Sequence, residues 1–264
     1  MNIFWREFRA HLKSLLIYSI IIFLFTVTGF TKFKTYAENP EMLAILEQMP
    51  KAVLEALNMT VFNLTTLSGF YGIMHIYYAL ILGIAAVMWG SDVIAKEERD
   101  KTVEFSLVLP VTRSRLVTAK LLAVIVHSIL LLGVTVLSFF VSSRSYTPDE
   151  GFWDFFYTSM AGLFLLQMIF IAIGIFLGCA MQQYRRAGAV AIAILLGTYF
   201  LSIVASLHEK VEFLKYFSPF KYADAGMIWR EGRIEPIYLW LSLVILVACL
   251  GLAYWRYNRR DLYI

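Results

Sequence analysis

The residue types that perform covalent chemistry are present in this chain without the spacing that a catalytic site requires. The sequence contains no G-x-x-x-x-G-K-[ST] phosphate loop, no H-E-x-x-H zinc motif and no G-x-S-x-G nucleophile motif. His208, Glu209 and Lys210 form an isolated polar triplet, while Cys179 and Cys249 stand in apolar stretches, where cysteine behaves as a small core residue. We therefore expect no catalytic residue, no metal site and no cofactor bound by this chain.

Three polar side chains, His75, His127 and Gln167, stand within long apolar stretches, and His75 is near the outer end of its stretch, where the membrane interface tolerates it. Such groups in a membrane either form hydrogen bonds between helices or line a path for a transported molecule. The first role is the simpler one, and we keep Gln167 and His127 as candidates for a translocation path. No Asp, Glu, Lys or Arg stands near the middle of these stretches, which disfavours a proton- or sodium-coupled transporter.

Residues 96–120 combine dense charge with an apolar run. Ten of these 25 residues are charged, and they surround the sequence V-E-F-S-L-V-L-P at 103–110. An apolar protrusion in a charged segment indicates a docking surface for a protein partner. The alternative is a basic anchor that only fixes the orientation of the chain.

Local signals predict two helices in this segment. The side chain of Asp100 or Thr102 can cap a short helix by accepting hydrogen bonds from N–H groups of the first turn. Pro110 ends that helix, because proline disfavours helical geometry at the preceding residue. Thr112 can then cap the next helix, whose first turn carries Arg113.

The rest of the chain has the composition of a membrane protein. Of its 264 residues, 60% are apolar and 16% are charged, whereas soluble domains have about 25% charged residues. A helix needs roughly 20 apolar residues to cross a bilayer, where all backbone polar groups must be paired internally. We predict an all-α, polytopic membrane protein with six transmembrane helices in one membrane domain, near residues 14–31, 72–92, 117–141, 156–181, 187–206 and 236–256.

The distribution of charge predicts that both termini are cytoplasmic. With that orientation the inner segments hold 14 of the 23 Lys and Arg residues and 7 of the 19 acidic residues. Inner segments therefore carry a net charge of +7 and outer segments −3, as the positive-inside rule requires. The overall charge of +4 reflects this asymmetry and does not indicate binding to nucleic acid.

Residues 1–13 have the pattern of an amphipathic helix at the inner membrane interface. The alternative is a charged orientation signal without defined geometry. At about 100° per residue, the apolar face carries Phe4, Trp5, Phe8 and Leu12, and the opposite face carries Asn2, Arg6, Arg9 and Lys13.

The outer segments also contain signals for short helices. Pro40 and Pro50 stand at first-turn positions of two amphipathic helices near 41–47 and 51–57. Residues 207–235 interleave aromatic and charged side chains, as is typical of a membrane–water boundary.

Small residues mark faces where helices approach each other closely. The spacing of such residues allows packing within one subunit or between subunits. The candidate packing residues are Gly83, Gly90, Gly174 and Gly178.

Three stretches of the sequence resemble the permease subunits of type 2 ABC exporters. Residues 98–115, E-R-D-K-T-V-E-F-S-L-V-L-P-V-T-R-S-R, followed by Lys120, resemble a family loop that runs approximately E-x-x-x-G-T-x-E-x-L-L-x-x-P-[VI]-[ST]-R. Residues 218–224 resemble the family's S-P-F-x-Y-x-D segment, and residues 259–262 its C-terminal ending. Lys101 stands where the family usually has glycine.

This resemblance implies a permease of the plasma membrane that works with separate cytosolic ABC ATPase subunits, on which ATP and Mg²⁺ bind. It further implies a second permease, identical or paralogous, with the translocation path between the two. The loop at 96–116 would form a coupling helix seated in a groove of the ATPase. The residues expected at that interface are Glu98, Arg99, Thr102, Val103, Glu104, Phe105, Leu107, Leu109, Pro110 and Arg113.

Two functions thus follow from the sequence. The first is the membrane subunit of an ATP-driven exporter, and the uncharged spans favour a hydrophobic or amphipathic substrate such as a peptide or a drug. The alternative is a membrane scaffold or assembly factor that transports nothing and recruits a cytosolic partner through the same loop.

Overall fold

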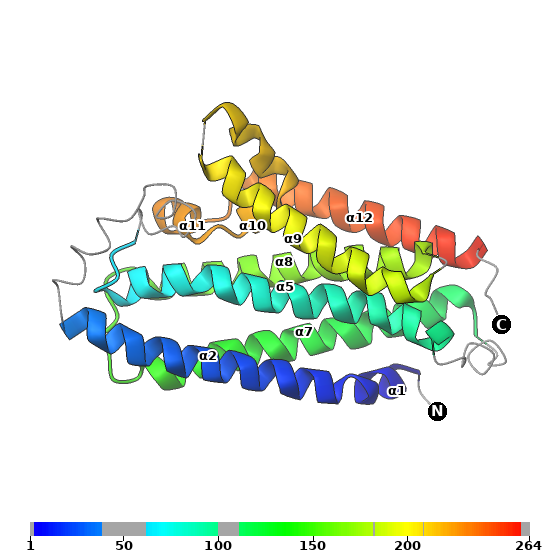
Figure 1. The fold of residues 1–264 in the computed structure, drawn as a ribbon, viewed down its shortest axis with the longest axis horizontal. Helices are drawn as coiled ribbons and strands as arrows, with labels where there is room; N and C mark the ends of the chain where they lie inside the picture. Colours follow the sequence, from blue (N-terminus) through cyan, green and yellow to red (C-terminus); the bar gives the residue numbers. More distant parts are fainter. Residues whose placement is uncertain (1–2, 39–61, 100–110, 182, 208, 260–264) are drawn as a thin grey trace.

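The computed structural model describes residues 3–38, 62–99, 111–181, 183–207 and 209–259 (Figure 1). Regular secondary structure within these ranges is helical throughout, which confirms the all-α prediction. Six of the described helices are long and apolar enough to cross a membrane, and each overlaps one of the six predicted stretches. They are α2 (Leu12–Glu38), α5 (Leu67–Arg99), α7 (Arg113–Ser143), α8 (Phe152–Ala180), α9 (Tyr184–Leu207) and α12 (Pro236–Arg259).

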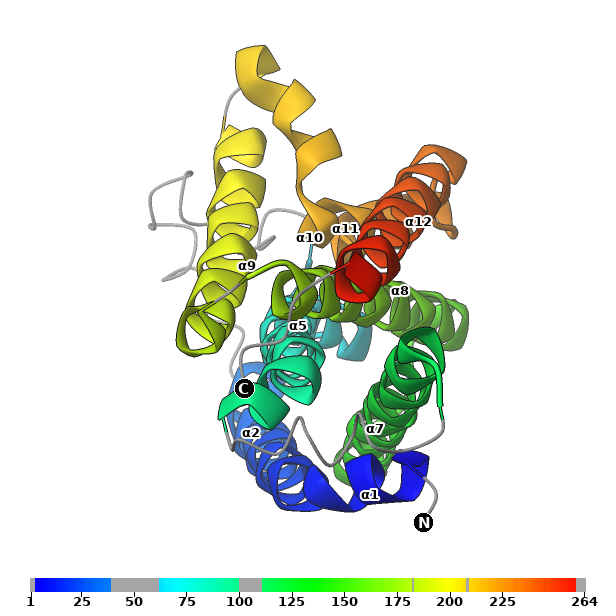
Figure 2. The ribbon, with the colours of Figure 1, turned by 90° about the vertical axis from the view of Figure 1, so that its right-hand side faces the viewer.

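Helices α5 and α8 form the centre of the bundle, and the other long helices surround them (Figures 1 and 2). The apolar stretch of α5 is 72% buried and that of α8 is 67% buried, compared with 17% for α2 and α12 and 22% for α9. We call the end of the bundle that carries α1, Arg99, Arg113 and Arg259 the terminal end, and the opposite end the distal end.

Helices α5 and α8 touch backbone to backbone through glycine. A Cβ atom placed on Gly90 would lie 2.6 Å from the carbonyl oxygen of Ile171, and one on Gly174 would lie 2.6 Å from that of Val87. Only glycine fits at such distances, so both residues are required for this approach. The other candidate packing glycines lie nearby, Gly178 against Ile94 of α5 and Gly83 against Leu195 of α9.

Aromatic side chains fill the distal part of the core. The ring of Tyr71 lies 5.1 Å from that of Phe139 and 5.0 Å from that of Phe156. The Tyr71 hydroxyl pairs with the Ser159 hydroxyl at 2.6 Å, which satisfies the one polar atom of this fully buried ring. The distal ends of α5, α7 and α8 are therefore held by dense packing.

Helix α1 (Ile3–Ala10) turns away from the axis of α2 and lies across the terminal end toward α7 (Figure 2). This direction suits the predicted interfacial helix, whose position relative to a membrane remains a prediction. The two helices predicted near 41–47 and 51–57 lie outside the described residues.

Residues 209–231 form three short helical elements between the last two long helices. Asp224 caps one of them by accepting a hydrogen bond from the Met227 N–H at 3.0 Å, and Gly232 ends it in the left-handed conformation at φ 67°. Helix α9 and the element that follows it lean away from the bundle (Figure 1). The elements are η1 (Glu209–Phe217), α10 (Pro219–Tyr222) and α11 (Ala225–Glu231).

Candidate functional site

The docking segment predicted from the sequence begins and ends on two helices of the terminal end. Helix α5 runs to Arg99, and α7 begins at Arg113. The Thr112 hydroxyl accepts a hydrogen bond from the Arg115 N–H at 3.3 Å, so Thr112 is the N-cap that the sequence predicts. These two helix ends fix where residues 100–111 leave and rejoin the bundle.

Most of the predicted interface residues lie outside the described residues. Arg99 and Arg113 are described, and so is the backbone of Glu98 but not its side chain. The remainder are Thr102, Val103, Glu104, Phe105, Leu107, Leu109 and Pro110.

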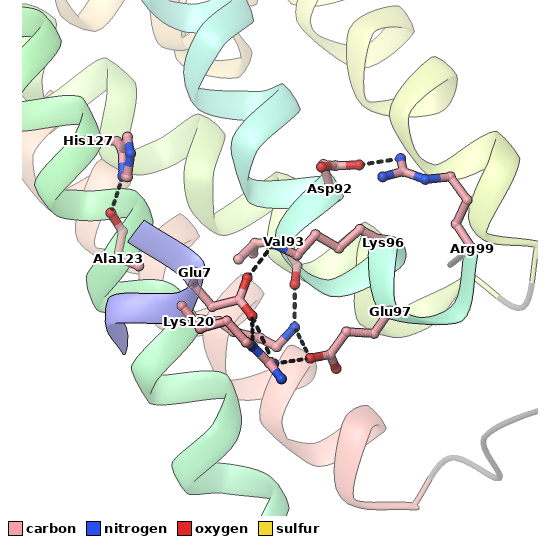
Figure 3. Close-up of polar contacts among 10 residues, drawn as sticks. Glu7, Asp92, Val93, Lys96, Glu97, Arg99, Lys120, Ala123 and His127 are labelled. Carbon is pink, nitrogen blue, oxygen red and sulfur yellow. Dashed lines mark hydrogen bonds and ion pairs between the residues drawn. The ribbon is translucent and has the colours of Figure 1, made fainter. Parts of the chain in front are cut away.

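A partly buried ion-pair network joins α1 to α5 at this end (Figure 3). The carboxylate of Glu7 in α1 is fully buried and accepts from Arg6 Nη2 at 2.9 Å. The ammonium of Lys96, in the last turn of α5, pairs with the other Glu7 oxygen at 2.5 Å. Arg6 Nη2 also donates to Glu97 Oε1 of α5 at 2.5 Å.

The same network reaches α7 through a buried lysine. Lys120 is fully buried, and its ammonium lies 3.2 Å from Glu97 Oε1. It also donates to the carbonyl oxygen of Val93 in α5 at 2.5 Å. We refer to Arg6, Glu7, Lys96, Glu97 and Lys120 as the terminal network; it connects α1, the end of α5 and the start of α7.

Opposite charges stabilise the ionised form of Glu7. Burial alone would raise the pKa of its carboxyl group, but nearby Lys120, Lys96 and Arg6 outweigh burial and hold this pKa below its ordinary value of 4.5. The terminal network holds three cations and two carboxylates. Because buried ion pairs are poorly screened by salt, it fixes the relative positions of the three helices firmly.

Arg113 contacts another helix of the chain. Its Nη1 atom lies 3.3 Å from the carbonyl oxygen of Tyr257 and 3.4 Å from that of Asn258, in the last turn of α12. A guanidinium at this position satisfies carbonyl groups that lack intrahelical partners. One turn further along α7, the Thr118 and Tyr254 hydroxyls lie 2.7 Å apart. The start of α7 is thus also tied to α12.

The face of α5 that turns away from the terminal network borders a cavity. Figure 3 shows Asp92 and Arg99 on this side, where their side chains pair at 2.6 Å. The cavity between α5 and α9 has a volume of about 470 Å³, within the range of ligand sites. It is lined by Met88, Ser91, Asp92, Ala95, Arg99, Gly188, Ala189 and Ile192.

A second, much smaller cavity lies between the distal parts of the same two helices. Its walls include His75 of α5 and Ser202 of α9, with the ion pair between Lys221 and Asp224 at 2.9 Å. Its volume of about 20 Å³ is enough for one water molecule. The α5–α9 seam therefore has a cavity near each of its ends, and both cavities have charged side chains in their walls.

The two candidate path residues lie between helices of one chain. Gln167 of α8 is fully buried, and its Nε2 donates to the carbonyl oxygen of Ser128 in α7 at 3.4 Å. His127 of α7 is also buried, with its ring 4.6 Å from that of Phe8 in α1 and 5.6 Å from that of Trp89 in α5. Neither residue lines the two cavities described above.

The terminal network was not predicted from the sequence. Arg6 was expected only on the basic face of an interfacial helix, and Lys120 only as the lysine that follows the family-like loop. The signal that was overlooked is Glu7, an acidic residue between Arg6 and Arg9 in an otherwise basic segment. An isolated carboxylate there indicates a partner inside the protein.

Within the described residues, no group of three or more His, Cys, Asp or Glu side chains is placed to hold a metal ion. The ionised groups of the terminal network hold the helix ends in place, and the two cavities lie between α5 and α9.

Comparison with known protein families gives a match over almost the whole chain. The model of a family described as ABC-2 family transporter protein matches residues 1–262. No curated protein matches the chain.

Proposed function

Because the chain belongs to the ABC-2 family of transporter proteins, we propose that it is the permease subunit of an ATP-driven exporter. Proteins of this family generally work with a cytosolic ATPase partner. In this proposal ATP and Mg²⁺ bind to that separate subunit, and residues 96–116 dock into its groove. The protein lies in the plasma membrane with both termini in the cytoplasm, as the net charge of +7 on the inner segments favours.

The observation that carries this proposal is the terminal network. A partner that pushes on residues 100–111 moves the permease only if the helix ends on either side are held firmly. Glu97 of α5 and Lys120 of α7 are paired at 3.2 Å in a buried environment, and Arg113 ties α7 to α12. The two ends of the segment are thus joined to each other and to the bundle.

The translocation path in this proposal follows the α5–α9 seam. The cavity at its terminal end combines the apolar side chains of Met88 and Ile192 with the Asp92–Arg99 pair. A cavity with apolar walls and one charged edge suits an amphipathic molecule, in agreement with the preference for hydrophobic or amphipathic compounds.

A second permease completes the path by packing against α9. This helix is little buried, and one exposed face carries Ala189, Ala193 and Gly197 at intervals of four residues. Such spacing allows the backbones of two membrane helices to approach closely. Ala189 also lines the cavity, so this face and the path are adjacent.

The proposal is tested by isolating the chain with its partner and then changing the docking segment. We expect an ATP-hydrolysing protein to co-purify with the wild-type chain in nanodiscs and its ATPase activity to respond to the permease. Phe105→Asp and Leu107→Asp each place a charge in the apolar run. Each should weaken binding of the ATPase by about 30-fold or more, the effect of losing a central apolar anchor.

A matched control is Phe213→Asp, which charges an exposed aromatic residue of η1 and should leave binding unchanged. Absence of any bound ATPase, or unaltered binding by both loop variants, would contradict the proposal. Binding without any effect on ATPase activity would favour the scaffold function.

A further inference from the structure

Each cavity of the α5–α9 seam holds a carboxylate that is paired with a basic side chain of the protein. In the larger one, which we call the terminal cavity, Asp92 Oδ1 accepts a hydrogen bond from Arg99 Nη1 at 2.6 Å. In the smaller one, which we call the distal cavity, Asp224 Oδ2 accepts from Lys221 Nζ at 2.9 Å. The two cavities therefore present the same chemistry at the two ends of the seam.

The serine hydroxyls in the walls of both cavities are left to accept hydrogen bonds. Ser91 Oγ donates to the carbonyl oxygen of Met88 at 3.1 Å, and Ser202 Oγ donates to that of Tyr199 at 2.6 Å. Ser206 Oγ donates to the carbonyl oxygen of Ser202 at 3.0 Å. Because a hydroxyl has a single hydrogen atom, each of these groups offers only lone pairs to the cavity. The walls therefore favour a ligand that donates hydrogen bonds.

His75 adds a buried nitrogen atom without a partner to the distal cavity. This residue lines the cavity and is only 2% exposed, and its Nε2 atom makes no hydrogen bond within the described part of the chain. Buried polar atoms are paired in the large majority of cases, so such an atom indicates a place for a hydrogen-bonding ligand. The cavity volume of about 20 Å³ admits a group of the size of one water molecule.

A primary ammonium group meets all of these requirements. It is a cation that can replace a basic side chain on a carboxylate, it donates three hydrogen bonds, and it is about as large as a water molecule. We therefore propose that the α5–α9 seam binds amphipathic molecules that carry a primary ammonium group, with Asp92 and Asp224 as the residues that bind this group. This inference rests on the proposed function, because it names the substrate class of the proposed path.

The terminal cavity has room for the whole of such a molecule. The side chains of Asp92 and Arg99 are 32% and 49% exposed, and an exposed ion pair contributes little to stability. An ammonium group of the ligand can thus replace Arg99 on Asp92 at small cost. The apolar part of the ligand then lies against Met88 and Ile192, which line the same cavity.

The terminal cavity is tested with octylammonium and octanoate, two probes with alkyl chains of similar length and opposite charge. Isothermal titration calorimetry on the full chain in nanodiscs, with empty nanodiscs subtracted, measures their affinities without the ATPase. Octylammonium should bind saturably and more tightly than octanoate. Asp92→Asn should weaken its binding by about tenfold or more, the effect of losing a charge-assisted hydrogen bond. Arg99→Gln should strengthen its binding, because the competing cation is removed.

The matched control is Asp154→Asn, since Asp154 is exposed and lines neither cavity; it should bind octylammonium as the wild type does. Tighter binding of octanoate, or unchanged binding of octylammonium in Asp92→Asn, would overturn the proposal. If Asp92→Asn does not fold, Arg99→Gln decides, because weaker binding of octylammonium there would contradict the exchange. The proposed function fails separately, when no ATPase co-purifies with the chain.

The distal cavity is tested by removing its own cation. Lys221→Met leaves the Asp224 carboxylate without its ammonium partner and should lower the apparent melting temperature. Ammonium chloride should restore stability more than tetramethylammonium chloride at the same ionic strength, because only a water-sized ion fits. In the matched control, Lys215→Met, the lost pair with Glu212 has the same spacing in sequence and lies near the surface, so neither salt should act selectively. Equal restoration of Lys221→Met by the two ions would overturn the assignment of a primary ammonium group.

Discussion

Lys120 shows what a buried charge requires in a membrane helix. Its ammonium has a backbone carbonyl at 2.5 Å and a carboxylate at 3.2 Å, so the free energy lost on leaving water is offset locally. Removing such a partner from a buried network costs about 3–5 kcal/mol. Position alone did not indicate this role, because a lysine near the start of a span equally suits the membrane surface. Its partners, Val93 O and Glu97 Oε1, both lie on α5, which no local pattern in α7 reveals.

His11 provides a pH-dependent test of packing at the terminal end. It precedes α2, it is buried, and its ring lies 5.9 Å from that of His127. Burial, with a smaller contribution from Lys96, lowers the pKa of His11 from 6.5 to about 4. The unfolded chain therefore binds this proton more tightly than the folded chain does, and stability falls as the pH drops from 6.5 toward 4.

We expect His11 to account for about 2 kcal/mol of the stability lost between pH 7.5 and pH 5. His11→Gln should remove that part of the loss, as measured by thermal unfolding in detergent at both pH values. The carboxyl group of Glu7 has a pKa below 4.5 and keeps its charge at pH 5, so its stabilising contribution does not change between the two pH values. Lys13→Gln, a nearby exposed change, should behave as the wild type; equal acid sensitivity of His11→Gln would contradict the assignment.

At the scale of elements, the contact between α5 and α8 depends on the absence of two side chains. A Cβ on Gly174 would lie 2.6 Å from Val87 O and 2.8 Å from Ser91 N, both backbone atoms that cannot move aside independently. Gly174→Ala should thus destabilise the fold by about 1–3 kcal/mol, although alanine favours helix by about 1 kcal/mol.

The matched control for Gly174→Ala is Gly133→Ala. In the part of the chain that the structure describes, a Cβ on Gly133 of α7 meets no atom of another element within 4 Å, so this variant should be neutral or slightly stabilising. Apparent melting temperatures in detergent, measured by fluorescence-detected size-exclusion chromatography, compare the two. A Gly174→Ala protein as stable as Gly133→Ala would show that the two helices have room to separate.

The sequence predicted most of the elements, because each depends on local information. Long apolar stretches identify the spans, and a threonine followed by a basic first turn identified the cap at Thr112. Helix ends were predicted less accurately. The predicted stretch 72–92 ends before the helix does, because α5 extends to Arg99. Its charged last turn is stabilised by partners in α1 and α7 that a hydropathy pattern does not reveal. The packing face of Gly90 and Gly174 was also visible in the sequence, but its partner helix was not.

At the scale of the whole molecule, the buried fraction of each long helix shows which helices are enclosed by the rest of the chain. Helices α5 and α8 are enclosed, whereas only 22% of the apolar stretch of α9 is buried. Lipid can cover exposed leucine and phenylalanine side chains equally well on any helix. Small residues at intervals of four, as on α9, instead favour another helix, because they permit backbone contact that lipid tails do not replace. The two cavities of the α5–α9 seam place the proposed path beside this face.

Gly197→Leu tests the pairing of permeases through α9. Among the described residues, a Cβ on Gly197 meets no atom of a neighbouring element within 4 Å, so the larger side chain should leave the subunit folded. It should obstruct a second helix and weaken pairing by about tenfold or more, the effect of a steric cost of about 1.4 kcal/mol. Mass photometry in nanodiscs measures the paired fraction. Gly251→Leu makes the same change on α12, where a Cβ also meets no atom of another described element within 4 Å, and should leave pairing intact. If both variants pair as well as the wild type, α9 is not the interface. If only Gly251→Leu loses pairing, the interface lies on α12.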